Sequence, residues 1–190
     1  MNNKFVTFFF ILGLLWLIYV SGSRNIFLGP IVEKDYEGFY VLDKYGNVYV
    51  AGGAEFLGDV EFEDEKAVDL EVSYDGYYIL DKTGKVYEFG DAEFYGDADL
   101  KEAIDLELVD NGYYILDKSG LVLTYGFIEK YGNGELSNYV DMEAINGGYY
   151  LLTADGRVET FGEARFLGDL SNVTLARAVA LAVTDIGYYI

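Results

Sequence analysis

The chain of 190 residues contains no cysteine and no histidine. Without cysteine there is no disulfide framework and no thiolate zinc site, although a cysteine-free chain suits any redox compartment. Without histidine the chain lacks the most common general base and transition-metal ligand, which excludes Ser-His-Asp catalysis, Cys-His catalysis and histidine zinc sites. Any catalysis would therefore depend on carboxylates, tyrosine or lysine.

Basic residues are also scarce. The chain has 13 Lys and Arg against 33 Asp and Glu, which gives a formal net charge of -20. Because nucleic-acid affinity rests largely on Lys and Arg that neutralise phosphates, this charge predicts that no nucleic acid is a partner. Apolar residues make up 52% of the chain and aromatic residues 17%, so we predict a packed domain rather than a disordered chain.

An uncharged apolar run, FVTFFFILGLLWLIYV, covers residues 5–20 and follows Lys4. As a helix this run would span roughly 24 Å, which is short for a membrane span but long for the apolar region of a signal peptide. Trp16 and Tyr19 favour a retained anchor, whereas Ser21-Gly22-Ser23 offers a cleavage site. We expect residues 1–23 to be either a signal peptide or a membrane anchor, with residues 24–190 exported; a buried core helix is the weaker alternative.

A repeat occupies the chain from residue 38 onward. Glycines in register recur with spacings of 38, 36, 36 and 39 residues, at Gly38, Gly76, Gly112, Gly148 and Gly187. The units 76–111 and 112–147 agree at 16 of 36 positions without gaps. Self-similarity at such a period is typical of one supersecondary unit copied in tandem.

Each unit has the pattern of antiparallel β-structure. The segment AVDLEV, residues 67–72, alternates apolar and acidic side chains and predicts a strand. YYIL, residues 77–80, is apolar on both faces, as expected of a strand between two layers, and DKTG, residues 81–84, predicts a turn. KVYEFG, residues 85–90, predicts the next strand, and DAEFYGD, residues 91–97, a turn with a short, irregular outer strand.

One such sheet cannot bury both of its apolar faces alone, so copies must pack face to face. Radial packing of small antiparallel sheets gives a β-propeller. We therefore predict an all-β fold: a β-propeller, or part of one, of four to five antiparallel blades of 36–39 residues, preceded by an N-terminal apolar helix. A flat stack or a solenoid is the alternative.

The blade pattern resembles the WD-repeat and YVTN-type propeller blade, in which the inner strand ends at a DG-like turn such as Asp75-Gly76 or Asn111-Gly112. It is more similar still to the GYW-L-V-x-x-D-G-G-V-F-x-F-G-D-A-x-F-Y-G repeats of secreted bacterial proteins, matched here by GYYILDKTGKVYEFGDAEFYG, residues 76–96. The resemblance covers residues 38–190 and lacks the WD dipeptide itself. It implies export or a surface location without a defined activity.

The units do not add up to a familiar closed ring. Blades are predicted to begin near Pro30, Val68, Ile104 and Val140, and a fifth opens with AVALAVTDIGYYI, residues 178–190. We expect a propeller domain that is incomplete at its C-terminal end, as a piece of a longer product. The alternatives are a ring that a second chain completes by self-association and a ring closed when NIFLG, residues 25–29, adds an outer strand.

The predicted inner strands carry an acidic pair in each of three units: Asp69 and Glu71, Asp105 and Glu107, and Asp141 and Glu143. Inner strands line the axis of a propeller, and rings of carboxylates there could hold Ca²⁺, which prefers six to eight oxygen ligands. The alternative is that these acids lie on a solvated or interblade surface and pair with Lys or Tyr. Ala180 and Ala182 replace both acids in the last copy, which favours the alternative.

Two aromatic residues follow the first glycine of every unit: Phe39-Tyr40, Tyr77-Tyr78, Tyr113-Tyr114, Tyr149-Tyr150 and Tyr188-Tyr189. Aromatic faces stack on sugars, so the pairs are compatible with a lectin. At this strand position we expect them to pack between blades.

Carboxylate catalysis needs only two suitably spaced acids, as in glycoside hydrolases. Here the acids follow the repeat, whereas an active site usually breaks it. The irregular loops 60–66 and 133–139, where specificity is expected, carry no recognisable catalytic constellation.

We therefore expect a non-catalytic binding or scaffolding module that acts outside the cytoplasm, either secreted or anchored in the membrane through residues 5–20. Its expected partner is a protein or a glycan at the cell surface. The alternatives are a carbohydrate-binding propeller and a carboxylate-based glycan hydrolase or lyase.

Overall fold

The structure is a computed structural model that describes residues 38–74, 76–174, 176–184 and 186–190, together with four two-residue strands nearer the N-terminus. These pair as β1 (Phe10–Ile11) with β2 (Leu14–Leu15) and β3 (Val20–Ser21) with β4 (Arg24–Asn25). Apart from these strands, residues 1–37 lie outside the described residues. The apolar helix predicted over residues 5–20 and the signal or anchor segment therefore stay predictions. In the described part of the chain, no helix is long and apolar enough to cross a membrane.

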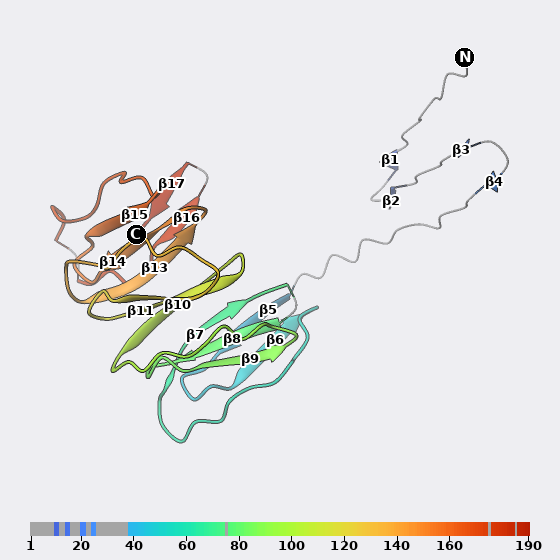
Figure 1. The fold of residues 1–190 in the computed structure, drawn as a ribbon, viewed down its shortest axis with the longest axis horizontal. Helices are drawn as coiled ribbons and strands as arrows, with labels where there is room; N and C mark the ends of the chain where they lie inside the picture. The colour runs from blue at the N-terminus through green and yellow to red at the C-terminus, as the bar shows by residue number, and fades with distance from the viewer. Residues whose placement is uncertain are drawn as a thin grey trace, which may run out of the picture.

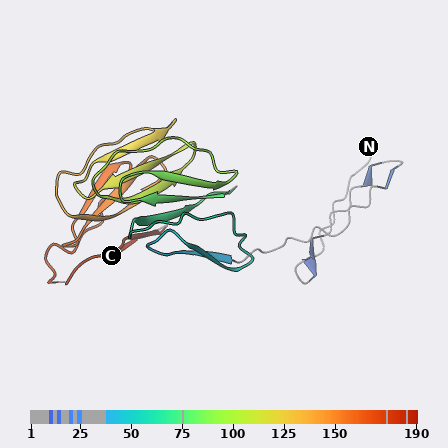
Figure 2. The same cartoon turned by 90° about the horizontal axis from the view of Figure 1, so that it is seen from below.

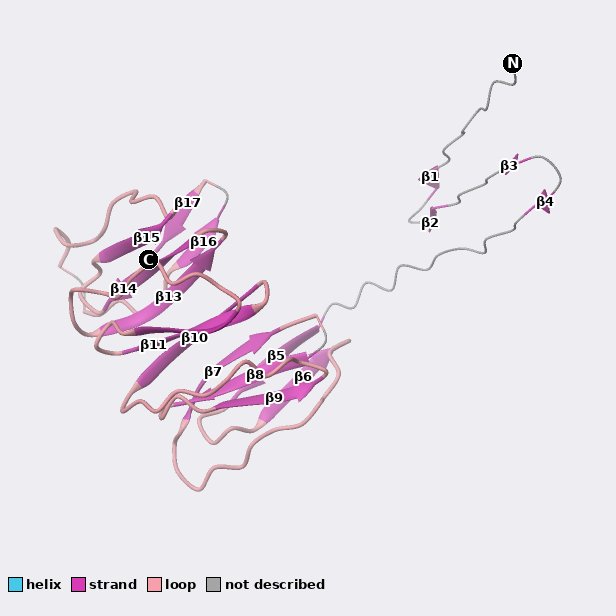
Figure 3. Ribbon diagram, viewed as in Figure 1, coloured by secondary structure: helices cyan, strands magenta, loops and turns pink. Residues whose placement is uncertain are grey.

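From residue 38 onward the regular structure of the described residues is entirely antiparallel β (Figure 3). Each sheet comes from one repeat unit, and the sheets follow in chain order. Their strands are β5 (Gly38–Leu42) and β6 (Val48–Gly52); β7 (Ala67–Val72), β8 (Gly76–Asp81) and β9 (Val86–Gly90); β10 (Ala103–Val109), β11 (Gly112–Asp117) and β12 (Val122–Gly126); β13 (Tyr139–Ile145), β14 (Gly148–Thr153) and β15 (Val158–Gly162); and β16 (Ala182–Thr184) and β17 (Gly187–Tyr189). The strands predicted in the second unit are confirmed.

The turn between the middle and third strands is built by a carboxylate. Asp81 Oδ1 accepts hydrogen bonds from the backbone N–H groups of Thr83 at 2.8 Å and of Lys85 at 3.2 Å. Gly84 closes the turn with φ of 87°, in the left-handed region that side chains disfavour. The turn predicted from DKTG is therefore confirmed.

The prediction of a short outer strand after the third strand is wrong. In the described residues, 91–102 form no strand. The backbone of this segment bonds to tyrosine hydroxyls and turns instead of a fourth strand: Glu93 C=O accepts from Tyr78 Oη at 2.8 Å, and Ala98 N–H donates to Gly84 C=O at 2.9 Å. With its hydrogen bonds satisfied in this way, the segment has no need of strand pairing.

The sheets stack face to face, and an apolar core fills each interface (Figures 1 and 2). Between the β7–β9 and β10–β12 sheets, Leu80 and Val86 meet Leu106 and Ile115. The core is thus divided among the interfaces rather than gathered in one centre. This is the arrangement expected when each unit depends on its neighbours to cover its faces.

The described residues therefore form a repeated antiparallel β-sheet fold. The inner strands β7, β10 and β13 contact one another in succession, as they would around a common axis. No hydrogen-bonded strand pairing joins the β5–β6 sheet to the β16–β17 sheet among the described residues, so closure into a propeller stays a prediction.

Candidate functional site

The acids predicted to line the axis lie on the inner strands β7, β10 and β13. Asp105 lies opposite Leu116 on the neighbouring strand, and Glu107 lies opposite Tyr114. Cross-strand partners share a face of a sheet, so both acids face the β13–β15 sheet, against which Leu116 and Tyr114 pack. The same register recurs in the other two sheets and brings the predicted residues to the interfaces: Asp69, Glu71, Asp105, Glu107, Asp141 and Glu143.

Each aspartate of this set bonds to the backbone of the next repeat unit. Asp69 Oδ2 accepts the N–H of Leu106 at 3.1 Å. Asp105 Oδ2 accepts the N–H of Met142 at 2.5 Å, and Asp141 Oδ2 accepts the N–H of Leu181 at 2.5 Å. We call these three bonds the aspartate ladder. The register of the strand pair shifts directly before each aspartate.

In the β10–β12 sheet the glutamate two residues further along extends the ladder. Glu107 Oε2 accepts the N–H of Ala144, on β13, at 2.9 Å. β10 is therefore tied to β13 by two successive carboxyl groups, which satisfy N–H groups along an otherwise unpaired strand edge. Of the alternatives for these acids, the structure supports placement between the sheets, with backbone N–H groups rather than Lys or Tyr as partners.

Burial raises the pKa of every carboxyl group in the set. Asp105 is the most enclosed, and burial, followed by the charges of Asp69, Glu107 and Asp141, raises its pKa well above the ordinary value. Burial raises the pKa of Glu107 to about 9, although its bond from Ala144 opposes the shift.

The same cause acts on the flanking acids. Burial raises the pKa of Glu71 to about 7 and that of Asp141 to about 6. A buried carboxyl that holds its proton at neutral pH, as Glu107 does, avoids repulsion from its neighbours, whereas Asp141 is mostly ionised there.

A cation would be an alternative means of neutralising these acids. Within the part of the chain that the structure describes, no group of three or more acidic side chains is arranged so that it could hold a metal ion. Ca²⁺ binding by the six acids stays a prediction.

The tandem aromatic residues of the three three-stranded sheets lie between sheets, as predicted. Tyr78 packs edge to face on Tyr113 with ring centroids 5.5 Å apart, and Tyr114 packs on Tyr149 at 5.1 Å. The second aromatic of one unit thus meets the first aromatic of the next.

The two hydroxyl groups of each pair have different partners. Tyr113 Oη donates to Gly96 C=O of the preceding unit at 2.6 Å and accepts the N–H of Gly96 at 3.0 Å. Tyr114 Oη donates to Glu129 C=O of its own unit at 2.8 Å. One residue of the pair therefore holds the neighbouring loop and the other holds its own loop.

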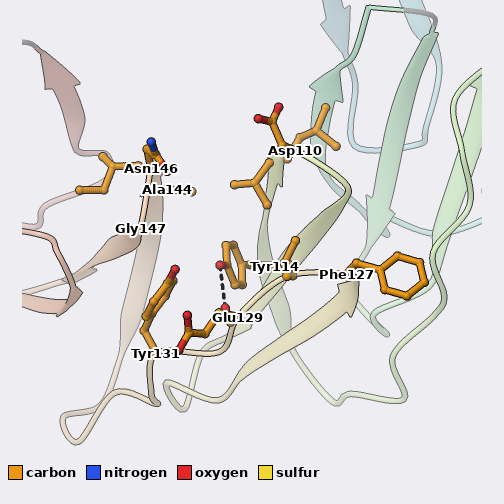
Figure 4. Close-up of a pocket in the computed structure, with 12 residues that line it drawn as sticks. Asp110, Tyr114, Phe127, Glu129, Tyr131, Ala144, Asn146 and Gly147 are labelled. Atoms are coloured by element: carbon orange, nitrogen blue, oxygen red, sulfur yellow. Dashed lines mark hydrogen bonds between the residues drawn. The ribbon is translucent and has the colours of Figure 1, made fainter.

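An open pocket of about 480 Å³ lies between the β10–β12 and β13–β15 sheets, at the end where β10 turns into β11 (Figure 4). We call it the Asp110 pocket. Asp110 and Asn146 stand on opposite sides of its opening, and the Tyr131 side chain points toward it (Figure 4). Phe127 belongs to the lining, but its ring points away from the pocket and is 95% exposed (Figure 4).

A second pocket of about 480 Å³ is lined by the irregular loop at Ser137, Asn138 and Tyr139 and by two arginines, Arg157 and Arg177. We call it the Arg157 pocket. It lies against the turn that joins β14 to β15, at the end of the sheets opposite the Asp110 pocket. Part of the irregular region in which specificity was expected therefore lines a pocket.

The Asp110 pocket was not predicted from the sequence. A signal for it exists, because Phe127 and Ile128 stand where the second unit has Asp91 and Ala92. That departure falls on a loop that lines the pocket. The ladder was also missed, since a carboxylate that follows the repeat gives no indication of its partner.

Comparison with known proteins gives one informative match. No family model and no curated protein matches the chain. The crystal structure of the computationally designed Ika8 protein is similar with a TM-score of 0.56 and 15% identity, over 94% of this chain and 64% of that chain. The chain therefore spans less than two thirds of the designed protein's length, and it shares with that protein a repeated β-sheet fold.

Proposed function

We propose that this chain is a non-catalytic binding module of the β-propeller type that acts outside the cytoplasm. The observation that carries the proposal is the Asp110 pocket, an open site at an inter-sheet interface whose rim departs from the repeat at Phe127 and Ile128. Binding sites are concave and combine a few polar groups with apolar surface, as this pocket does.

The acids of the ladder argue against a catalytic role. A glycosidase needs one carboxyl as acid and another as base or nucleophile, both facing the substrate. Asp69, Asp105 and Asp141 each bond to a backbone N–H of the next unit and lie between the sheets. The repeated carboxylates thereby serve the packing of the fold.

A carbohydrate is the ligand class that the lining of the Asp110 pocket favours. Asp110, Asn146 and the Tyr131 hydroxyl provide the kinds of donor and acceptor that bond to sugar hydroxyls. No Lys or Arg is among the residues that line it. Together with the net charge of -20, this favours a neutral or amine-bearing sugar over an anionic one.

A glycan array probed with the full chain in mild detergent tests the proposal. We expect binding to neutral or amine-bearing glycans that D110N and N146A each weaken by about tenfold, the effect of losing one or two hydrogen bonds. D64N, at an exposed loop position away from the pocket, is the matched control and should leave binding unchanged. Release of shorter sugars from a bound glycan would instead favour the hydrolase or lyase, and a blank array would overturn the carbohydrate assignment.

A further inference from the structure

The Arg157 pocket is basic in a chain that is strongly acidic. The charged side chains in its lining are three basic ones, Lys118, Arg157 and Arg177, and one acidic one, Asp155. The chain as a whole has 13 basic residues against 33 acidic ones. Positive charge is thus gathered at this pocket against the net charge of the molecule, as a site for an anion requires.

A similar pocket one interface earlier shows which charges the repeat usually places here. This pocket of about 500 Å³, which we call the Asp99 pocket, shares Lys118, Ser137 and Asn138 with the Arg157 pocket. Its charged lining consists of three acids and two lysines: Asp99, Glu102, Asp117, Lys101 and Lys118. The Asp99 pocket therefore has one more negative than positive charge, whereas the Arg157 pocket has two more positive than negative charges.

An acid of the Asp99 pocket is replaced by an amide in the next unit. The Lys118 N–H donates to Glu102 C=O at 3.0 Å, and the Ala154 N–H donates to Asn138 C=O at 2.9 Å. Because the two bonds are equivalent, Asn138 takes the position of Glu102. One negative charge of the repeat is lost in this way.

The same position carries an arginine in the last unit. Arg177 directly precedes Ala178, whose N–H donates to Ala154 C=O at 2.9 Å. The equivalent bond one unit earlier joins the Tyr139 N–H to Lys118 C=O. Arg177 therefore follows Glu102 and Asn138 in this series, and the sign of the charge is reversed within three units.

Arg157 adds the second charge that departs from the repeat, since it stands where the preceding unit has Leu121. Its Nε donates to Asp155 Oδ2 at 2.9 Å, and both side chains are partly exposed. Among the described residues no hydrogen bond is made to the two Nη groups of Arg157. Those groups are the ones with which a guanidinium binds a planar anion.

We infer that the Arg157 pocket binds a small ligand through a carboxylate group. The planar guanidinium matches a carboxylate with two parallel N–H···O bonds. Ser137 and Asn138 add neutral hydrogen-bonding groups to the lining, and a volume of about 480 Å³ suits a small molecule. The Asp155 carboxylate in the same lining disfavours a doubly charged phosphate more than a singly charged carboxylate.

The site is distinct from the Asp110 pocket. The two pockets share no lining residue and lie at opposite ends of the sheets. In the Asp99 pocket the turn of the following unit, residues 154–156, contributes no lining residue although it is present. The Arg157 pocket follows the same plan, so its lining is provided by residues that precede β16.

NMR titration of the full chain in mild detergent tests the inference with glucuronate as the probe. The methyl ester of glucuronate has the same ring without the charge, and glucose 6-phosphate carries a phosphate on a similar ring. We expect glucuronate to bind, and the ester to bind at least about tenfold more weakly because it cannot accept charge-assisted hydrogen bonds. Glucose 6-phosphate should bind more weakly than glucuronate.

Two substitutions assign the binding to this pocket. R157Q and R177E should each weaken glucuronate binding by about tenfold, and R177E restores the sign of charge that Glu102 gives the Asp99 pocket. Arg177 is exposed, so R177E should keep its circular dichroism spectrum. R165Q removes one charge from an exposed loop residue outside the lining, and as the matched control it should leave binding unchanged.

Four results would overturn the inference. Equal binding of glucuronate and its ester would show that the charge is not recognised, and tighter binding of glucose 6-phosphate would assign the pocket to phosphate. Unchanged binding in both R157Q and R177E would place the site elsewhere, and an equal loss in R165Q would show attraction to general charge. D110N should leave glucuronate binding unchanged, so failure here and failure at the Asp110 pocket are distinguishable.

Discussion

Replacing Glu107 by glutamine should stabilise the fold at neutral pH and not at acid pH. In the folded chain burial raises the pKa of Glu107 to about 9 from an ordinary value of 4.5. Between these two values the unfolded chain loses the proton that the folded chain keeps. The unfolded state then binds fewer protons, so stability falls as the pH rises through this window and is highest below it.

The magnitude follows from the width of the window. Each pH unit above 4.5 lowers stability by about 1.4 kcal/mol, so the penalty at about pH 7 has an upper bound of about 3.5 kcal/mol. Glutamine does not titrate, and its carbonyl oxygen can still accept the N–H of Ala144 that Glu107 accepts at 2.9 Å. We therefore expect E107Q to gain about 1 to 3 kcal/mol at about pH 7 and to be nearly neutral at about pH 4.

Urea unfolding of the full chain in mild detergent, followed by circular dichroism at both pH values, measures the effect. E63Q, in an exposed loop, is the matched control and should change stability by less than about 0.5 kcal/mol at either pH. An equal effect of E107Q at both pH values, or a loss of stability at both, would refute the argument that Glu107 holds a costly proton.

Three further changes test the other contacts. Y113F removes the hydroxyl that bonds to both backbone groups of Gly96, and urea unfolding should show a loss of about 1 to 3 kcal/mol because those groups stay buried. G96A should lose more than about 1 kcal/mol in the same assay, since φ is +138° and the added carbon would lie 2.7 Å from the Tyr125 ring. D81A should lose about 1 to 2 kcal/mol with the turn bonds to Thr83. Excess Ca²⁺ should leave the melting temperature unchanged if protons neutralise the ladder, and a clear rise that a chelator reverses would support the predicted cation site.

Much of the repeat unit was predictable because its signals are local. The alternation in AVDLEV fixes a strand at Ala67–Val72, and Asp81 with Gly84 fixes the turn that follows β8. The outer strand was mispredicted because its hydrogen bonds go to partners outside the segment. Tyr78 Oη, 15 residues away in the sequence, takes the carbonyl that a fourth strand would have paired.

The site was less predictable because its partners lie in other units. Asp105 bonds to Met142, 37 residues along the chain, and a single copy of the unit contains no hint of that contact. The irregular loop 133–139 was identified as a place for specificity because it departs from the repeat, and it lines the Arg157 pocket. Phe127 departs from the repeat too, but a single exposed aromatic residue in a tyrosine-rich chain gave too weak a signal.

The ladder has a consequence for how the sheets are spaced. The apolar faces of the sheets are rich in Tyr, Leu and Ile, and the hydrophobic effect that holds them together is non-directional. It would therefore tolerate a shift of one sheet along the next. A carboxyl group that must meet one particular N–H does not tolerate that shift, because a misplaced partner would leave both groups buried and unpaired. Asp69, Asp105 and Asp141 each impose this condition on the unit that follows. The burial that this placement requires raises the pKa of Asp105 and Glu107, and the last unit has Ala180 and Ala182 at the equivalent positions.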